Sequence, residues 1–289
     1  MKSDDISAQG QPHTKGGGVE KILYVLKTAK RIGIKKSTKA LMSKNTCKSC
    51  GLGMGGQRGG MINEAGDFPS VCNKSVQAQQ TDIQPAIPLA LFEHTLEDLR
   101  KLSAKQVEHA GRLANPLYKA PNSTHFQAVE WDVALAHIVK AFSDAQPDRT
   151  FFYSSGRSSN EAGFGLQLLA RLYGTNNVNN CSFYCHQATG VAMKNSMGGG
   201  TATIQLEDLQ HCDTIFVIGA NPASNHPRFL YQLKNCRDRG GNVVVINPAK
   251  EPGLVRFGLP KNPVSLIKGG NEIATHYVQP NIGGDIALI

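Results

Sequence analysis

Residues 214–222 read TIFVIGANP, and residues 241–248 read GNVVVINP. Each stretch is a short apolar run, rich in β-branched residues, that ends at an Asn-Pro turn, which is typical of a buried strand followed by a loop. Residues 228–239 between them are predicted to form a helix. Two strands joined by a helix of this length lie parallel in one sheet, through a right-handed crossover.

The same alternation continues towards the N-terminus. Residues 151–153 are predicted to form a short strand, and residues 160–173 an amphipathic helix. A further amphipathic helix is expected over 131–142. The predicted fold class is therefore α/β, with a doubly wound parallel sheet preceded by a small irregular segment.

The part of the chain before residue 131 has weaker patterns. Residues 19–34 read as a basic amphipathic helix, expected to dock on the body of the protein or on a partner. Residues 76–125 read as irregular apart from a charged helix near 93–110. The predicted parts of the chain are a disordered tail (1–18), a basic helix with a cysteine-containing segment (19–85), and an α/β domain (86–289).

Charge is concentrated at the N-terminal end of this 289-residue chain. Residues 1–60 hold 12 Lys and Arg against 3 Asp and Glu, which accounts for the whole net charge of +9. Such a segment suits an acidic partner, a membrane surface or a nucleic acid, although a solvated basic arm explains it equally well. Tyr24 is its one aromatic residue, which argues against binding of single-stranded nucleic acid by stacking.

The sequence has no apolar stretch long enough to span a membrane and no secretory signal at its start, so a cytoplasmic location is expected. The seven cysteines are an odd number without the spacing of a disulfide framework. They are therefore expected to be reduced thiols, some of them metal ligands.

The first cysteine group is Cys47-x2-Cys50, with Cys72 following at a distance. Two thiolates on one tight turn and a third from a later loop suit an iron–sulfur cluster. Zinc is the alternative, but no second Cys or His pair lies at the spacing of a zinc ribbon.

The second cysteine group lies in residues 176–186, which read NNVNNCSFYCH and are expected to form a loop between two helices. Cys185 and His186 are neighbours, and a thiol beside an imidazole either ligates a metal or forms a nucleophilic thiolate. Cys181 is expected to be a small thiol packed under this loop.

Polar residues follow the two predicted strands of the opening stretch, where ligands bind in open parallel sheets. Gly219 allows a phosphate to approach the backbone, and amide or hydroxyl side chains there can bond phosphate or ribose. The candidates are Gly219, Asn221, Ser224, His226 and Asn247. Ordinary turn chemistry is the alternative for each of them. No Gly-x-Gly-x-x-Gly motif follows a strand, which argues against a nicotinamide dehydrogenase.

The stretch 156–161, GRSSNE, lies between a predicted strand and a predicted helix. Ser159 or Asn160 is expected to cap that helix, and Glu161 complements its dipole.

In this order, the features resemble the catalytic subunit of molybdopterin-dependent oxidoreductases, in the formate-dehydrogenase-like alpha (molybdopterin) subunit branch. The resemblance runs from about residue 40 to the last residue and implies that the irregular segment is of iron–sulfur type. It implies that Cys185 ligates molybdenum or tungsten and that His186 accepts a proton near the substrate.

The resemblance also implies two cofactors. One is bis-molybdopterin guanine dinucleotide, contacted by Arg157, Asn160 and the strand-end residues, with Asp285 on the guanine. Many relatives have Asp where this chain has Asn247. The other is a 4Fe–4S cluster held by Cys47, Cys50 and Cys72, with Lys74 between cluster and pterin. Its ligand set is incomplete, because Met54 stands where relatives have a further cysteine. The alternatives are a cluster with one non-cysteine ligand, a three-iron cluster or a vestigial site.

The implied function is two-electron oxidation of formate or a similar small substrate, with electrons leaving through the cluster to a redox partner protein. Relatives continue for several hundred residues further, so the chain is expected to be an N-terminal portion with little turnover alone. The alternatives are an inactive fragment, a basic binding module without cofactor, and a thiol-dependent hydrolase or transferase using Cys185 and His186.

Overall fold

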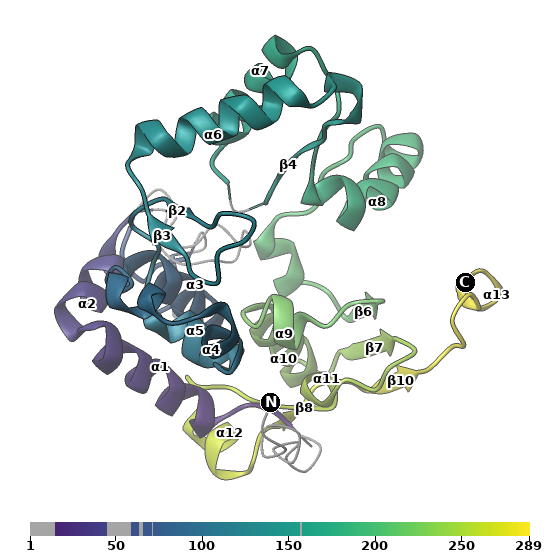
Figure 1. The fold of residues 1–289 in the computed structure, drawn as a ribbon. Helices are drawn as coiled ribbons and strands as arrows, with labels where there is room; N and C mark the ends of the chain where they lie inside the picture. Colours follow the sequence, from purple (N-terminus) through teal and green to yellow (C-terminus); the bar gives the residue numbers. More distant parts are fainter. Residues whose placement is uncertain (1–14, 45–58, 64–65, 71, 157) are drawn as a thin grey trace. The chain divides into compact units, whose positions relative to one another are not determined.

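The computed structural model describes residues 15–44, 59–63, 66–70, 72–156 and 158–289. Contacts divide the chain into two compact units, each described by itself (Figure 1). Unit 1 consists of Met1–Pro85 with Gln205–Ile289, and unit 2 of Ala86–Ile204. The three-part division expected from the sequence remains a prediction.

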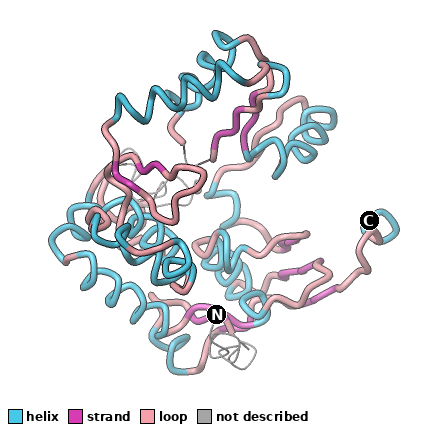
Figure 2. The backbone as a smooth tube through the Cα atoms, in the orientation of Figure 1, coloured by secondary structure: helices cyan, strands magenta, loops and turns pink. Residues whose placement is uncertain are grey.

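Unit 1 contains a parallel sheet of three strands in the order β10-β7-β6, seen in magenta in Figure 2. The strands are β6 (Thr214–Ile218), β7 (Asn242–Ile246) and β10 (His276–Val278). Ile215 pairs with Val243, and Val217 with Val245. The two predicted strands and their parallel pairing are therefore confirmed.

One face of this sheet forms the core of unit 1. Helix α10 (Phe229–Asp238) follows β6, as predicted, and packs against both β6 and β7. Its Leu230 and Leu233, three residues apart, are both fully buried because they share one side of the helix. The buried core cluster consists of Leu209, Ile215, Val217, Leu230, Leu233, Cys236, Val243, Val245, Leu254, Phe257, Leu259 and Ile273.

The opposite face of β6 is open among the described residues. Phe216 and Ile218 alternate with the core residues and are 60% and 50% exposed. The strands follow one another across the sheet in chain order, so right-handed connections would all lie on one face. An α/β fold with parallel strands is thus confirmed, while the second helical layer of a doubly wound sheet remains a prediction.

The basic helix expected over 19–34 is confirmed as α1 (Val19–Ile32). A second helix, α2 (Ile34–Met42), follows directly. The break falls at Gly33, whose φ of 105° is unfavourable for residues with a side chain. As expected, α1 docks on the protein body: it packs on α3 (Asn73–Ile83), and the Tyr24 hydroxyl donates to Gln80 Oε1 at 3.3 Å.

The interpretation of residues 76–125 as mostly irregular was wrong for α3. Its sequence NKSVQAQQTDI has no apolar stripe, and the side chains it buries include Ser75, Gln79 and Gln80. Because its inner face is mostly polar, with Val76 as an apolar member, the hydrophobic period that identifies a helix from sequence is absent. The charged helix near 93–110 is two helices, α4 (Leu96–Arg100) and α5 (Ala104–Ala110).

Unit 2 confirms the predicted helices at 131–142 and 160–173 and the strand at 151–153. They are α6 (Trp131–Asp144), α7 (Asn160–Tyr173) and β4 (Phe152–Ser154). Strand β4 pairs in parallel with β5 (Val178–Asn180), which leads into α8 (Cys181–Met197). The Tyr173 hydroxyl donates to the Phe142 carbonyl at 2.8 Å, which links α7 to α6.

The remaining described elements are short. In unit 1, Gly16 and Gly17 of the expected tail form a strand beside β8. The elements of unit 1 are β1 (Gly16–Gly17), η4 (Leu206–Gln210), α9 (Pro222–Asn225), α11 (Pro252–Val255), β8 (Arg256–Gly258), α12 (Pro263–Ile267), β9 (Asn271–Glu272) and α13 (Asp285–Leu288). Those of unit 2 are η2 (Leu89–Glu93), β2 (Leu117–Tyr118), β3 (Gln127–Ala128) and η3 (Pro147–Arg149). Among the described helices, none has the length and apolar character that a membrane crossing requires.

Candidate active site

The expected loop position of Cys185 and His186 was wrong: both lie in the second turn of α8. The Asn180 side chain caps this helix, accepting hydrogen bonds from the backbone N–H of Ser182 at 3.0 Å and of Phe183 at 3.3 Å. Apolar residues of α8 are scattered around the helix rather than gathered on one side, so its sequence lacks the helical period.

Both candidate catalytic side chains are accessible. Cys185 is a free, exposed thiol, and His186 is exposed beside it. Adjacent residues on a helix do not face each other, so the imidazole is not aimed at the thiol of its neighbour. This geometry disfavours a nucleophilic Cys–His pair. It suits two side chains that each contact a separate bound group.

Helix α8 starts at the carboxyl end of the parallel pair β4 and β5, where Ser154 lies opposite Asn180. The loop after β4 lies against this helix start, since a Cβ atom on Gly156 would lie only 2.7 Å from Cys181 Sγ. The half-buried Cys181 thus packs on the Gly156 loop, and Cys185 stands one turn further along. This is the end of a parallel sheet at which ligands bind.

Asn180→Ala is expected to destabilise α8 by about 1 kcal/mol, because two N–H groups of the first turn lose their acceptor. Hydrogen exchange of the Ser182 and Phe183 amides should become faster. The matched control is Asn195→Ala, an exposed position on the same helix, where exchange at these amides should not change. Unchanged exchange in Asn180→Ala would show that the cap does not hold this turn.

One residue before α7 has a structural role as a helix cap. Ser159, one of the two predicted caps, accepts a hydrogen bond from the Ala162 N–H at 3.2 Å. Asn160 is the first residue of α7 and is exposed. Arg157 lies outside the described residues. The expected contact of Arg157 and Asn160 with a pterin therefore remains a prediction.

In unit 1, the structure brings two of the strand-end candidates, Gly219 and Asn247, to one edge of the sheet. Gly219 donates its N–H to the Ile246 carbonyl at 2.9 Å, and Asn247 Nδ2 lies 3.5 Å from the Ala220 carbonyl oxygen. Gly219 has φ of 60°, and a Cβ atom added there would meet nothing within 4 Å. The backbone at Gly219 is therefore open to a ligand.

The other strand-end candidates, Asn221, Ser224 and His226, lie in or at the ends of the short helix α9 (Pro222–Asn225). Asn221 Oδ1 accepts from the Ser224 N–H at 3.2 Å, which caps the short α9. Ser224 and His226 are exposed. His226 lines an open cavity of about 320 Å³ at the end of β6, whose other walls are mainly apolar. Sequence reasoning missed the walls of this cavity, Phe216, Ile218, Ala220, Pro222 and Phe229, because apolar residues in a strand or helix carry no ligand signal.

Asp285 is exposed at the first position of α13, and its expected contact with the guanine remains a prediction. Cys185 and His186 lie in unit 2, whereas Gly219 to Asn247 lie in unit 1.

The iron–sulfur candidates are only partly described. Cys47, Cys50 and Met54 lie outside the described residues. Cys72 is 8% exposed and precedes the first residue of α3, which also carries Lys74. No group of three or more His, Cys, Asp or Glu side chains with metal-binding geometry occurs among the residues that the structure describes.

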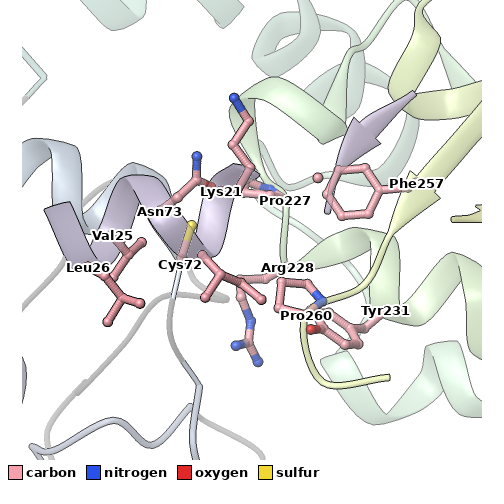
Figure 3. Close-up of a pocket in the computed structure, with 12 residues that line it drawn as sticks. Lys21, Val25, Leu26, Cys72, Asn73, Pro227, Arg228, Tyr231, Phe257 and Pro260 are labelled. Carbon is pink, nitrogen blue, oxygen red and sulfur yellow. The ribbon is translucent and has the colours of Figure 1, made fainter. Parts of the chain in front are cut away.

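Cys72 lines a largely apolar cavity of about 230 Å³ (Figure 3). Ile22, Val25 and Leu26 of α1 form part of its wall. Figure 3 shows the charged ends of Lys21 and Arg228 pointing in opposite directions. The low exposure of Cys72 suits a ligand to a buried centre and equally a packed thiol.

Comparison with known proteins shows which family this chain resembles. The model of the family described as molybdopterin oxidoreductase matches residues 112–268. An uncharacterized oxidoreductase of Mycobacterium tuberculosis is 38% identical over 196 residues, covering 68% of this chain and 25% of that protein. Protein YdeP of Escherichia coli is 40% identical over 221 residues, which cover 75% of this chain and 29% of that protein.

A more distant relative is the alpha subunit of F420-dependent formate dehydrogenase 1 of Methanococcus maripaludis. It is 31% identical over 147 residues, which cover 50% of this chain and 22% of that protein. A solved structure, acetylene hydratase from Pelobacter acetylenicus, has a TM-score of 0.39 and 18% identity over 52% of this chain and 22% of its own. The matches thus span between about a fifth and 29% of the length of these relatives.

Proposed function

This chain belongs to the molybdopterin oxidoreductase family, and from that premise we propose that it supplies the metal-binding thiolate and part of the cofactor site of a molybdenum or tungsten oxidoreductase. The observation that carries the proposal is the exposed Cys185–His186 pair on α8, at the carboxyl end of β4 and β5. A soft, accessible thiolate is the donor that such a metal takes when dithiolene sulfurs already hold it.

The strand-end residues of unit 1 support a pterin dinucleotide as the proposed cofactor. Gly219 leaves open space for a phosphate, and Asn247 holds the neighbouring strand end in place through its contact with the Ala220 carbonyl. We propose the cofactor to be bis-molybdopterin guanine dinucleotide. Arg157, Asn160, Asn221, Ser224, His226 and Asp285 are further candidate contacts, and Lys74 the candidate link to a cluster.

We propose that the reaction is two-electron oxidation of formate or a similarly small substrate. When bound, the cofactor supplies the redox chemistry. Cys185 would hold the metal, and the His186 ring nitrogen would accept the proton that formate releases on becoming carbon dioxide. Support for formate comes from the Methanococcus maripaludis relative, which is named as a formate dehydrogenase subunit.

For electron exit we propose an iron–sulfur cluster with Cys47, Cys50 and Cys72 among its ligands, and a redox partner protein as acceptor. Thiolate ligands need reduced cysteines, which fits a cytoplasmic location. The low exposure of Cys72 supports its part in this proposal.

The complete enzyme that contains this chain, purified anaerobically from its natural host, is expected to contain molybdenum or tungsten near one atom per enzyme molecule and to reduce a viologen dye with formate. Elemental analysis and dye reduction measure the two parts separately. Metal without formate oxidation would refute only the proposed substrate. Protein that is folded but free of both metals would refute the cofactor proposal itself.

A further inference from the structure

Helices α1 and α2 of unit 1 each have a packed side and an exposed side. Both helices contact α3. On α1, Thr28 and Ile32 are buried. The Tyr24 hydroxyl, on the same side of α1, donates to Gln80 of α3. On α2, Ser37 is the buried residue. The sides opposite these residues therefore point away from α3.

The exposed side of α1 combines apolar and basic residues. Four residues at helical spacing lie along one stripe of this side: Val19, Leu23, Lys27 and Lys30. Val19 is 53% exposed and Leu23 is 48% exposed, and both lysines are exposed as well. Apolar side chains in line with lysines on an exposed helix are typical of a helix that lies on another surface.

Helix α2 repeats this combination. Lys35, Lys39 and Met42 are spaced by four and three residues, share its exposed side and are all exposed. The name basic outer face is used below for the seven residues of the two stripes, which are Val19, Leu23, Lys27, Lys30, Lys35, Lys39 and Met42.

The charge of this region is strongly positive. Residues 19–44 hold seven Lys and one Arg against one acidic residue, Glu20. Among the residues that the structure describes, no Lys or Arg of α1 or α2 forms an ion pair. The other acidic residues of the first 60 are Asp4 and Asp5. Even if both paired with these lysines, the excess of positive charge would remain.

Proteins, nucleic acids and membranes can all present negative charge, and the composition of the basic outer face distinguishes them. Interfaces between proteins are depleted in lysine and enriched in arginine and aromatic residues, whereas this face has four lysines and neither of the others. A nucleic-acid backbone offers phosphates but no apolar layer for Val19 and Leu23. An anionic bilayer offers both, because apolar side chains enter below the head groups while lysines extend to the lipid phosphates.

We propose that the basic outer face binds the surface of an anionic lipid bilayer. Val19, Leu23 and Met42 enter the boundary between head groups and acyl chains, and the four lysines contact the lipid phosphates. The helices lie along the surface, while their packed sides stay on α3. This inference does not depend on the proposed redox function.

Sedimentation of the full chain with lipid vesicles tests the inference. One set of vesicles is phosphatidylcholine with about one third phosphatidylglycerol, and the other is phosphatidylcholine alone. Binding to the anionic vesicles is expected to be at least about tenfold stronger than to the neutral ones. Raising the salt concentration from about 0.1 M to about 0.5 M should weaken it, because salt screens the lysines.

A first pair of variants tests the lysines. Lys27→Gln with Lys30→Gln should weaken binding to the anionic vesicles at least about tenfold. The matched control is Lys250→Gln with Lys268→Gln, two exposed lysines of the same unit outside the basic outer face. Both variants lose the same charge, so a larger effect of the first assigns binding to α1 rather than to the overall charge.

A second pair tests the apolar residues, which a purely ionic attraction would not need. Val19→Gln with Leu23→Gln should weaken binding to the anionic vesicles at least about tenfold, because both side chains lose their apolar layer. The control is Val264→Gln with Ile267→Gln on α12, where the two side chains are 57% and 86% exposed. It should bind as the parent does. Circular dichroism checks the fold of each variant.

The inference is overturned if the chain does not sediment with the anionic vesicles, or if a control variant weakens binding as much as its partner variant. A short DNA duplex and poly-glutamate, at the same concentration of negative charge as the anionic lipid, serve as competitors. Vesicle binding should survive both. Displacement by the duplex would assign the face to nucleic acid, and displacement by poly-glutamate to an acidic protein; either result would contradict the proposal.

Discussion

Cys185→Ala is expected to lower substrate-dependent dye reduction by at least about a thousandfold in the complete enzyme, because removing the thiolate removes the proposed bond to the reacting metal. The exposed position of Cys185 on α8 means that its loss leaves no cavity in the core. X-ray absorption at the metal edge should show one sulfur scatterer fewer, which is a readout independent of turnover.

The matched control is Cys181→Ala, one helical turn earlier on α8. Its thiol packs on the Gly156 loop, so this variant should retain the sulfur scatterer and most of the activity. Cys185→Ser should hold the metal through oxygen with a changed absorption edge. Full activity and an unchanged edge in Cys185→Ala would refute the proposed ligand.

Leu230→Ala is expected to destabilise unit 1 by about 2–5 kcal/mol, the range for removal of a fully buried leucine side chain. Leu230 is 0% exposed and belongs to the cluster that joins α10 to β6 and β7. Its truncation leaves a cavity behind the sheet that carries Gly219 and Asn247. Denaturant unfolding followed by circular dichroism measures the effect.

Ile267→Ala in the same unit is the control for this substitution. Ile267 is 86% exposed on α12, so its truncation should change the unfolding free energy by less than about 0.5 kcal/mol. If Leu230→Ala costs no more than this control, then α10 does not form the core of the sheet.

Several elements were predictable because their evidence is local. Strands β6 and β7 are runs of apolar β-branched residues, and helices α6, α7 and α10 repeat apolar residues at helical spacing. Helix α3 was not predictable in this way, because three of its buried residues, Ser75, Gln79 and Gln80, are polar. Helix α8 was missed because its apolar residues surround the helix.

The candidate site likewise has one part that the sequence predicted and another that only the structure shows. The strand-end position of Gly219, Asn221 and Asn247 follows from the sequence, because a strand that ends in an Asn-Pro turn sets its own carboxyl end. The Cys185–His186 pair was also visible in the sequence. That Cys185 stands one turn beyond a thiol packed on Gly156 required the structure, since it depends on the pairing of β4 with β5.

By itself, the sequence determined the candidate reactive groups and the strand–helix–strand order, since both are encoded by residues close together in the chain. The tertiary structure alone decided that one face of β6 is open and that Asp67, Arg228 and Lys261 share one cavity. These residues are far apart along the chain. No local pattern encodes their meeting; the hydrogen bond from the Lys261 N–H to the Tyr231 hydroxyl, for example, joins α10 to a segment thirty residues further along the chain.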